Sequence, residues 1–152
     1  MDVLRQSEPI SEETQANYYQ KQVWPSMSEK YPKDILLRFL KDDELIGYGG
    51  LVHISWENKR AEVSFLLDPV LAADLDAYAR CYTNFLSLLK NLAFSDLQLK
   101  RLFTETYATR KHHISVLELN GFRVEGVMKN HNYINGKPVD SVIHGFLQSY
   151  GE

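Results

Sequence analysis

One long amphipathic segment between two strand-like runs constrains the fold most. Over about residues 71–97, apolar side chains recur at steps of three and four, the spacing of a helix that buries one stripe. The stripe is formed by Leu75, Tyr78, Tyr82, Phe85, Leu89 and Leu92. RAEVSFLL (60–67) precedes the segment and RLFTETY (101–107) follows it, and both read as strands. A helical crossover joins neighbouring strands that run parallel, so the sequence predicts a β-α-β unit.

An antiparallel meander is expected before this unit. Three runs read as its strands: 34–41, 45–56 and 60–67. The polar links KDDE and ENK between them are too short for a crossover, which indicates antiparallel neighbours. Gly47, Gly49 and Gly50 in the middle run indicate a bulge or a close approach of two backbones.

The two ends of the chain carry clear boundary signals. Ser11 can cap a helix over 12–23. Thr109 can cap another over 110–119, which Asn120-Gly121 would end through a left-handed residue. Two further strands, 122–133 and 139–147, flank Asn135-Gly136, a strong hairpin signal.

These elements predict one α/β domain over residues 1–152. Its mixed sheet would comprise an antiparallel meander, then a parallel strand and a C-terminal hairpin, with helices on both faces.

Composition narrows the function classes. The chain has 152 residues, 44% of them apolar, and a formal net charge of -3. Its charges are scattered without a basic stripe, so no nucleic-acid partner is expected. Its apolar stretches have strand length, so no membrane partner is expected either. With one cysteine there is no intrachain disulfide, and we expect a cytoplasmic protein.

The C-terminal run LELNGFRVEGVMKNHNYINGKPVDSVIHGFL resembles the GNAT superfamily of acyl-CoA-dependent N-acyltransferases. LIGYGGL and RAEVSFLLDP resemble the second to fourth strands of that family. The likeness is closest to members that acylate amino sugars or protein N-termini. It implies that acetyl-CoA is a co-substrate, that a small-molecule amine is the acceptor, and that no metal is needed.

Three departures from the family pattern stand out. The family begins with a strand and a helix before the part that EPISEETQANYYQ resembles, so either the start of this chain was assigned too late or the domain is N-terminally truncated. A truncated sheet would expose an edge that could pair with a second copy in a homodimer. Counting back from Ala93-Phe94, the two glycines of the phosphate-binding turn fall near Arg80 and Tyr82. Arg80 could bind phosphate by charge instead, or be a solvated helix residue. The family's general acid, a tyrosine, is here Leu117, which cannot donate a proton.

The resemblance makes Glu62 the best general-base candidate, acting through water. His53 precedes it by nine residues across a short turn, so the two side chains could be cross-strand neighbours and His53 a second catalytic residue. A purely structural role explains Glu62 as well as a catalytic role does, and it explains His53 better than a catalytic role does. Leu66, Leu67 and Asp68 lie where the family's strand bulges and its backbone holds pantetheine.

The remaining site candidates are polar or aromatic. Arg110 and His113, beside Lys111 and His112, make a basic helix start that could meet a phosphate of CoA, or simply a solvated helix end. The candidates for acceptor binding are Trp24, Tyr31, His131 and Tyr133, which packing would explain as well. Adjacent histidines do not share a helix face, so a metal site is not expected.

The sequence thus favours an enzyme that moves an acetyl or short acyl group from acyl-CoA to a primary amine. The leading acceptor is an amino sugar of a surface-polysaccharide pathway, and a protein N-terminus is the second. The rival interpretation is a degenerate GNAT-fold module that binds a ligand or partner without catalysis, favoured by the missing glycines and by Leu117.

Overall fold

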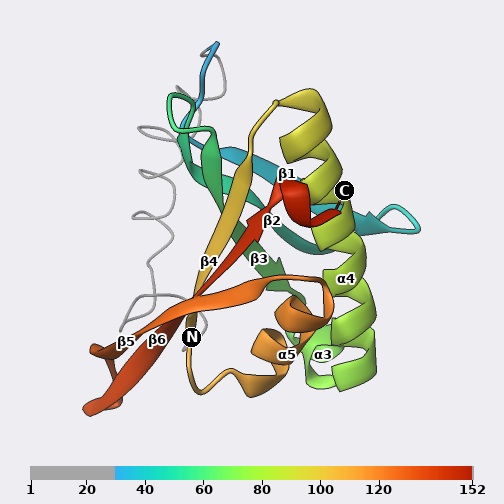
Figure 1. The fold of residues 1–152 in the computed structure, drawn as a ribbon. Helices are drawn as coiled ribbons and strands as arrows, with labels where there is room; N and C mark the ends of the chain where they lie inside the picture. The colour runs from blue at the N-terminus through green and yellow to red at the C-terminus, as the bar shows by residue number, and fades with distance from the viewer. Residues whose placement is uncertain (1–29, 152) are drawn as a thin grey trace, which may run out of the picture.

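The computed structural model describes residues 30–151, and these form one mixed six-stranded sheet with helices packed against it (Figure 1). The strands lie in the order β1-β2-β3-β4-β6-β5. Their bounds are β1 Ile35–Lys41, β2 Glu44–Ser55, β3 Arg60–Leu67, β4 Arg101–Tyr107, β5 Arg123–Ile134 and β6 Lys137–Leu147. Within the described residues, this confirms the predicted α/β architecture.

The predicted strand directions are confirmed. β1, β2 and β3 form an antiparallel meander, and β3 pairs with β4 in parallel. The predicted close approach in β2 is also found, since a side chain on Gly49 would lie 2.1 Å from the Ser64 carbonyl oxygen of β3. The irregularity in the β2–β3 ladder lies further along, between Val52 and Ser55, where His53 has a φ of +49°.

The expected single helix over 71–97 is wrong in one respect, because Asp74 interrupts it. The short helix α3 (Pro69–Ala73) ends at Asp74, and α4 (Leu75–Asn91) begins there. The Asp74 carboxylate accepts hydrogen bonds from the N–H groups of Asp76 and Ala77, both at 3.0 Å, and so caps the new helix. A π-helical turn, η2 (Leu92–Asp96), closes the segment.

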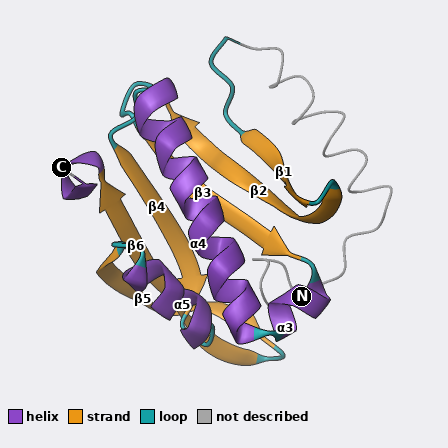
Figure 2. Cartoon of the chain, turned by 90° about the vertical axis from the view of Figure 1, so that its right-hand side faces the viewer, coloured by secondary structure: helices purple, strands orange, loops and turns teal. Residues whose placement is uncertain are grey.

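α4 crosses one face of the sheet, with α5 (Lys111–Leu119) beside its first turns (Figure 2). We call this the helix face. Its core includes Phe65 of β3, stacked on Tyr82 of α4 with ring centroids 4.5 Å apart. Leu102 of β4 and Leu117 of α5 are fully buried in the same cluster. Residues of β3 alternate, so Ala61, Val63 and Phe65 face the helices and Glu62 faces the other way.

The C-terminal signals are mostly confirmed. Asn120 is the C-cap of α5, and Gly121 follows with a φ of +86°. Asn135 and Gly136 both adopt positive φ in the β5–β6 turn, as a two-residue hairpin requires. The predicted Thr109 cap is wrong, because Arg110 holds the N-cap position and makes no side-chain cap bond. The helix expected over 12–23 lies outside the described residues.

Candidate functional site

The site begins where two parallel strands separate. β3 and β4 are paired only from Arg60 to Glu62 and from Arg101 to Phe103, and beyond these pairs the strands diverge. The gap is a cleft of about 130 Å³. Its lining comprises Val52, Glu62, Val63, Ser64, Phe65, Leu66, Tyr82, Thr104, Glu105, Thr106, Tyr107, Arg110 and His113. Because the lining includes residues from both faces of the sheet, the cleft connects those faces.

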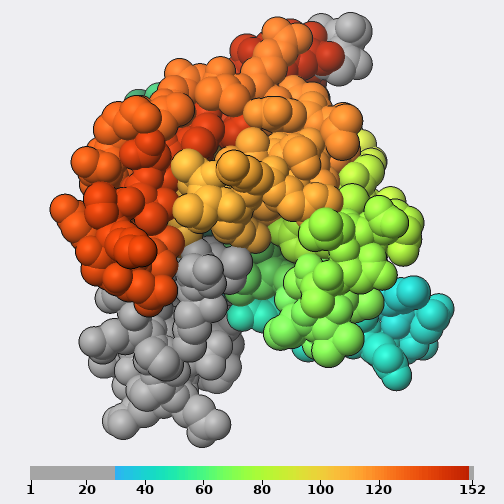
Figure 3. Space-filling model, turned by 90° about the horizontal axis from the view of Figure 1, so that it is seen from below, coloured from blue at the N-terminus to red at the C-terminus, as the bar shows by residue number. Residues whose placement is uncertain are grey.

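The carboxyl ends of β3 and β4 lie at the end of the molecule seen in Figure 3. The segments that follow the two strands, α3 with the start of α4 (green) and α5 (amber), lie side by side there. His112 of α5 is within hydrogen-bond distance of the Leu75 carbonyl oxygen, 2.9 Å from Nε2, which ties the two helix starts together. The start of α5 lines the cleft through Arg110 and His113, and the start of α4 lies beside it.

A histidine and a glutamate meet on the sheet face away from the helices, which we call the carboxylate face. His53 Nδ1 lies 2.6 Å from Glu62 Oε2, which confirms that the two side chains are neighbours. The Glu62 side chain is 6% exposed, whereas that of His53 is 67% exposed. The Asp34 carboxylate accepts a hydrogen bond from the His53 backbone N–H at 3.0 Å, which helps to hold the left-handed backbone there. A buried carboxylate is thus connected to an exposed imidazole.

A second, partly buried carboxylate lines the same face of the cleft and was not among the residues expected from the sequence. The Glu105 side chain is 13% exposed, and its Oε1 lies 3.8 Å from His131 Nε2. The Ser141 hydroxyl donates to the same carboxylate at 3.0 Å. The sequence signal that could have revealed Glu105 is the alternation of side chains along β4. Phe103 aligns with Glu62, and Glu105 lies two residues further on the same face.

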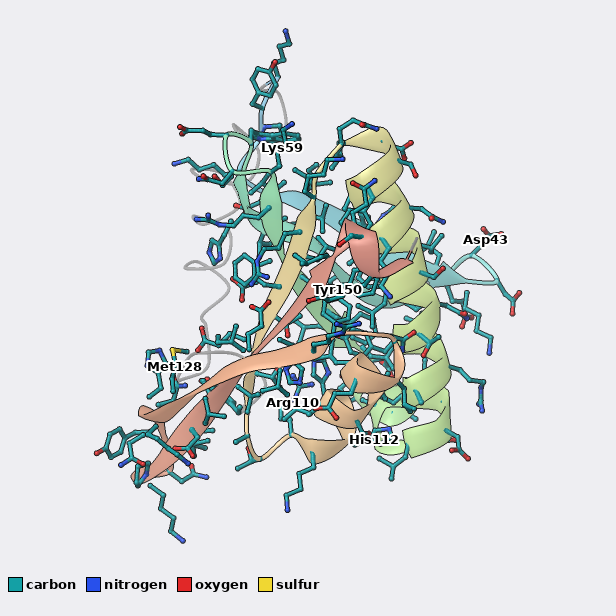
Figure 4. All side chains as sticks on the ribbon, viewed as in Figure 1. Asp43, Lys59, Arg110, His112, Met128 and Tyr150 are labelled. Carbon is teal, nitrogen blue, oxygen red and sulfur yellow. The ribbon has the colours of Figure 1, made fainter. Side chains whose placement is uncertain are left out.

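The helix face of the cleft carries a hydrogen-bonded cluster from two helices. The Tyr78 hydroxyl lies 2.5 Å from His113 Nδ1, and Arg110 Nη2 donates to the same hydroxyl at 3.1 Å. The His113 ring is stacked on Tyr82 with centroids 4.5 Å apart. Figure 4 shows Arg110 and His112 at the start of α5, beside the first turns of α4. Arg110 and His113 were expected in this region from the sequence, whereas their contact with Tyr78 was not.

Burial sets the protonation of this cluster. Burial, reinforced by the positive charge of Arg110, lowers the pKa of His113 well below its usual 6.5. Burial also raises the pKa of Tyr78 above 10, although Arg110 opposes the rise. At neutral pH, His113 is therefore an uncharged imidazole, and it cannot attract a phosphate by charge as the sequence interpretation required.

The two positions expected for the glycines of the phosphate-binding turn lie inside α4, and the N-terminus of α4 is acidic. α4 begins at Leu75, so Arg80 is an exposed residue of its second turn and Tyr82 is 1% exposed in the core. The turn that could meet a phosphate is at Asp74, whose carboxylate occupies the N–H groups of Asp76 and Ala77. Asp76 adds a second negative charge to that turn.

The other predicted residues are spread more widely. Leu66, Leu67 and Asp68 were expected to hold pantetheine through their backbone. Of these, only Leu66 lines the cleft, whereas Leu67 packs against the core and Asp68 caps α3. Tyr31 packs on Trp56, in the turn before β3, and does not line the cleft. His131 approaches Glu105, and Tyr133 is 67% exposed near the hairpin turn. Trp24 lies outside the described residues.

Membrane-spanning helices and metal-binding clusters are both absent from the described residues. No helix within residues 30–151 combines the length and apolar character needed to cross a bilayer. Among the same residues, histidine, cysteine and carboxylate side chains nowhere gather in a group of three that could hold a metal ion.

A family model described as an acetyltransferase (GNAT) domain matches residues 1–143. Among solved structures, the spermidine N-acetyltransferase of Vibrio cholerae in complex with CoA and spermine superposes with a TM-score of 0.80 at 20% identity, covering 100% of this chain and 85% of that chain. A probable acetyltransferase superposes with a TM-score of 0.70 at 23% identity, covering 88% and 74%. No curated protein matches the sequence.

Proposed function

The chain belongs to the GNAT acetyltransferase family, and on that premise we propose that it transfers an acetyl or short acyl group from acyl-CoA to a primary amine. The observation that carries the proposal is the pairing of Glu62 with His53 at a cleft between two diverging strands. The cleft would hold the thioester, and the carboxylate face would receive the amine.

The cleft suits the thioester arm of the donor. Beyond Glu62, β3 has no ladder partner on its β4 side, so its backbone can bond an amide-containing arm. Thr104 lines the cleft, and its hydroxyl is buried without a partner among the described residues. A buried hydroxyl without a partner is costly, and a polar atom of a bound donor would satisfy it.

The phosphate end of CoA fits less well. Two α4 N–H groups that would serve a diphosphate are held by Asp74, and Asp76 adds repulsion. Arg110 and Lys111 at the start of α5 are the nearby positive charges that could compensate. We therefore expect CoA to bind through its pantetheine arm and α5 rather than through a glycine turn at α4.

Glu62 is suited to be the base. The amine must lose a proton before its nitrogen can attack the thioester carbonyl, and a buried carboxylate can accept that proton. His53 Nδ1 lies 2.6 Å from Glu62 Oε2, and because this imidazole is mostly exposed it can pass the proton to solvent. Relay through an exposed imidazole lets Glu62 stay enclosed and still regenerate.

An amino sugar remains our leading acceptor. His131 on β5 approaches Glu105 of the cleft, and Tyr133 lies further along β5 near the hairpin turn, where rings could stack on a sugar or a nucleotide base. Glu62 and Glu105 also favour a second acceptor class, small diamines and polyamines, because two carboxylates can bind two ammonium groups. The similarity to a spermidine N-acetyltransferase supports that class. Initial rates with a nucleotide-linked amino sugar and with spermidine would separate the two classes.

The proposal is tested first by calorimetric titration of acetyl-CoA and of free CoA into the folded protein. Micromolar binding followed by acetyl transfer to an amine would support it. If neither ligand binds, the enzyme proposal is wrong.

The acidic start of α4 favours one alternative, a module that binds a ligand or partner without transferring an acyl group. In that case the cleft would still take small molecules, but no thioester would be consumed. Binding of CoA without turnover of any amine in a broad acceptor panel would favour this alternative.

A further inference from the structure

The cluster of Arg110, Tyr78 and His113 points to a second catalytic group. We propose that His113 donates a proton to the sulfur of the leaving thiolate and is recharged by Tyr78. This inference rests on the proposed acyl transfer, and it assigns the role of proton donor in a chain whose α5 carries leucine at position 117.

The chemistry of the three groups fixes one of the two hydrogen bonds. An arginine side chain only donates, so the Tyr78 oxygen accepts from Arg110 at 3.1 Å. The 2.5 Å contact between the Tyr78 oxygen and His113 Nδ1 fits either direction, and in the proposed step the Tyr78 hydroxyl donates. Because an uncharged imidazole carries one hydrogen, that hydrogen is on Nε2.

His113 Nε2 is the group that can serve a ligand. His113 lines the cleft, and within residues 30–151 this nitrogen has no hydrogen-bond partner. The ring is stacked on Tyr82, which limits its rotation and keeps the Nδ1 edge on Tyr78. The N–H donor is therefore held in place before a donor molecule enters.

The proton balance closes across the cleft. The amine, made neutral by its first proton loss to Glu62 and His53, bonds through nitrogen to the thioester carbonyl carbon. The nitrogen then loses a second proton to Glu62, the carbon–sulfur bond breaks, and the sulfur keeps its electron pair. The Nε2 proton of His113 passes to that sulfur, and the Tyr78 hydroxyl proton passes to Nδ1. The resulting tyrosinate lies beside the positive charge of Arg110. After the thiol leaves, a solvent proton adds to His113 Nε2 and the Nδ1 proton returns to the Tyr78 oxygen, which restores the starting tautomer.

Burial supports the same assignment. A neutral His113 at pH 7 can receive a proton on Nδ1 while giving one from Nε2, whereas an imidazolium would block the transfer from Tyr78. Because burial raises its pKa, Tyr78 stays protonated at neutral pH, and its hydrogen is available when the thiolate forms.

The test compares two thioesters in wild type and in Tyr78→Phe, a change that keeps the ring and removes only the hydroxyl. The donors are acetyl-CoA, whose thiol is basic, and S-(4-nitrophenyl) thioacetate, whose thiolate leaves without a proton. We expect kcat/KM with acetyl-CoA to fall about 100-fold and kcat/KM with the aryl thioester to change by less than about twofold. Tyr150→Phe removes a phenol hydroxyl from the cluster around Phe146, away from the cleft, and is the control.

Each other outcome is decisive. Equal losses with both donors mean that Tyr78 only supports the structure, and no loss means that the proton comes from elsewhere; either result overturns the inference alone. If the wild type turns over neither donor, the proposed function fails and this inference with it. Independently of turnover, nitrogen-15 NMR of the free protein is expected to show the His113 proton on Nε2, and a proton on Nδ1 would overturn the assignment.

Discussion

The two faces of the sheet at the cleft differ in how they hold their ionisable groups. On the carboxylate face, Glu62 and Glu105 are each next to an exposed histidine, with side-chain exposures of 67% for His53 and 48% for His131. On the helix face, Tyr78 and His113 are 7% exposed and packed among aromatic rings. In the proposed mechanism, the first arrangement exchanges protons with solvent and the second holds a proton for the leaving group. Both are needed there, because the ammonium loses two protons and the sulfur gains one.

Removing the base of the carboxylate face has the largest expected effect. Glu62→Gln keeps the shape and the hydrogen bond to His53 but cannot accept a proton. We expect kcat/KM to fall about 100-fold or more, which steady-state kinetics measures. We expect the free energy of unfolding to change by less than about 1 kcal/mol.

Glu57→Gln is the matched control for that change, because Glu57 is exposed in the turn before β3. It should leave kcat/KM unaltered. Wild-type turnover by Glu62→Gln would remove Glu62 from the mechanism and leave the carboxylate face with a binding role only.

The buried state of the helix face can be read from the pH dependence of stability. The folded pKa of His113 lies well below the unfolded value of about 6.5, so the unfolded chain binds the proton first as the pH falls. The stability that depends on a neutral His113 is fully present above pH 6.5. As the pH falls from 6.5 to the folded pKa of His113, the free energy of unfolding decreases by up to about 1.4 kcal/mol per pH unit. Urea unfolding at pH 7.5 and 5.5 measures it.

His113→Phe should flatten this part of the pH dependence while keeping an aromatic ring against Tyr82. Phe85→Leu, a core change without a titratable group, should lower stability equally at both pH values. An unchanged slope in His113→Phe would show that the histidine is not kept neutral by the fold.

The acidic cap of α4 can be altered without removing the cap. Asp74→Ser keeps an oxygen for the N–H groups of Asp76 and Ala77 but removes a charge. We expect free CoA to bind about two- to fivefold more tightly in calorimetry, the size of a helix-terminus charge effect. Asp96→Asn, at the far end of the same helical segment, should not change the affinity. Weaker CoA binding by Asp74→Ser would place the diphosphate elsewhere.

The smallest effect is expected at Tyr31. It packs on Trp56 rather than lining the cleft, so Tyr31→Ala should leave the KM for both substrates within about twofold of wild type. A large rise in the KM for the amine would return Tyr31 to the acceptor site.

Much of the fold could be predicted from local patterns. The spacing of apolar residues predicted the α4 stripe, and Asn135-Gly136 predicted the hairpin because both residues adopt positive φ there. The link between 56 and 60 was short enough to bring His53 to Glu62. The helix break at Asp74 was missed, because its carboxylate competes with helix continuation and apolar periodicity does not record that competition.

The sequence by itself determined the antiparallel meander, the C-terminal hairpin, the leucine at position 117 and the Glu62–His53 pair. Each of these depends on residues that are close along the chain. Only the tertiary structure decided where β3 and β4 separate, that Glu105 joins Glu62, and that Tyr78 meets Arg110 and His113 across more than 30 residues. Those features depend on the packing of α4 and α5 against the sheet, and burial by that packing sets which groups are charged.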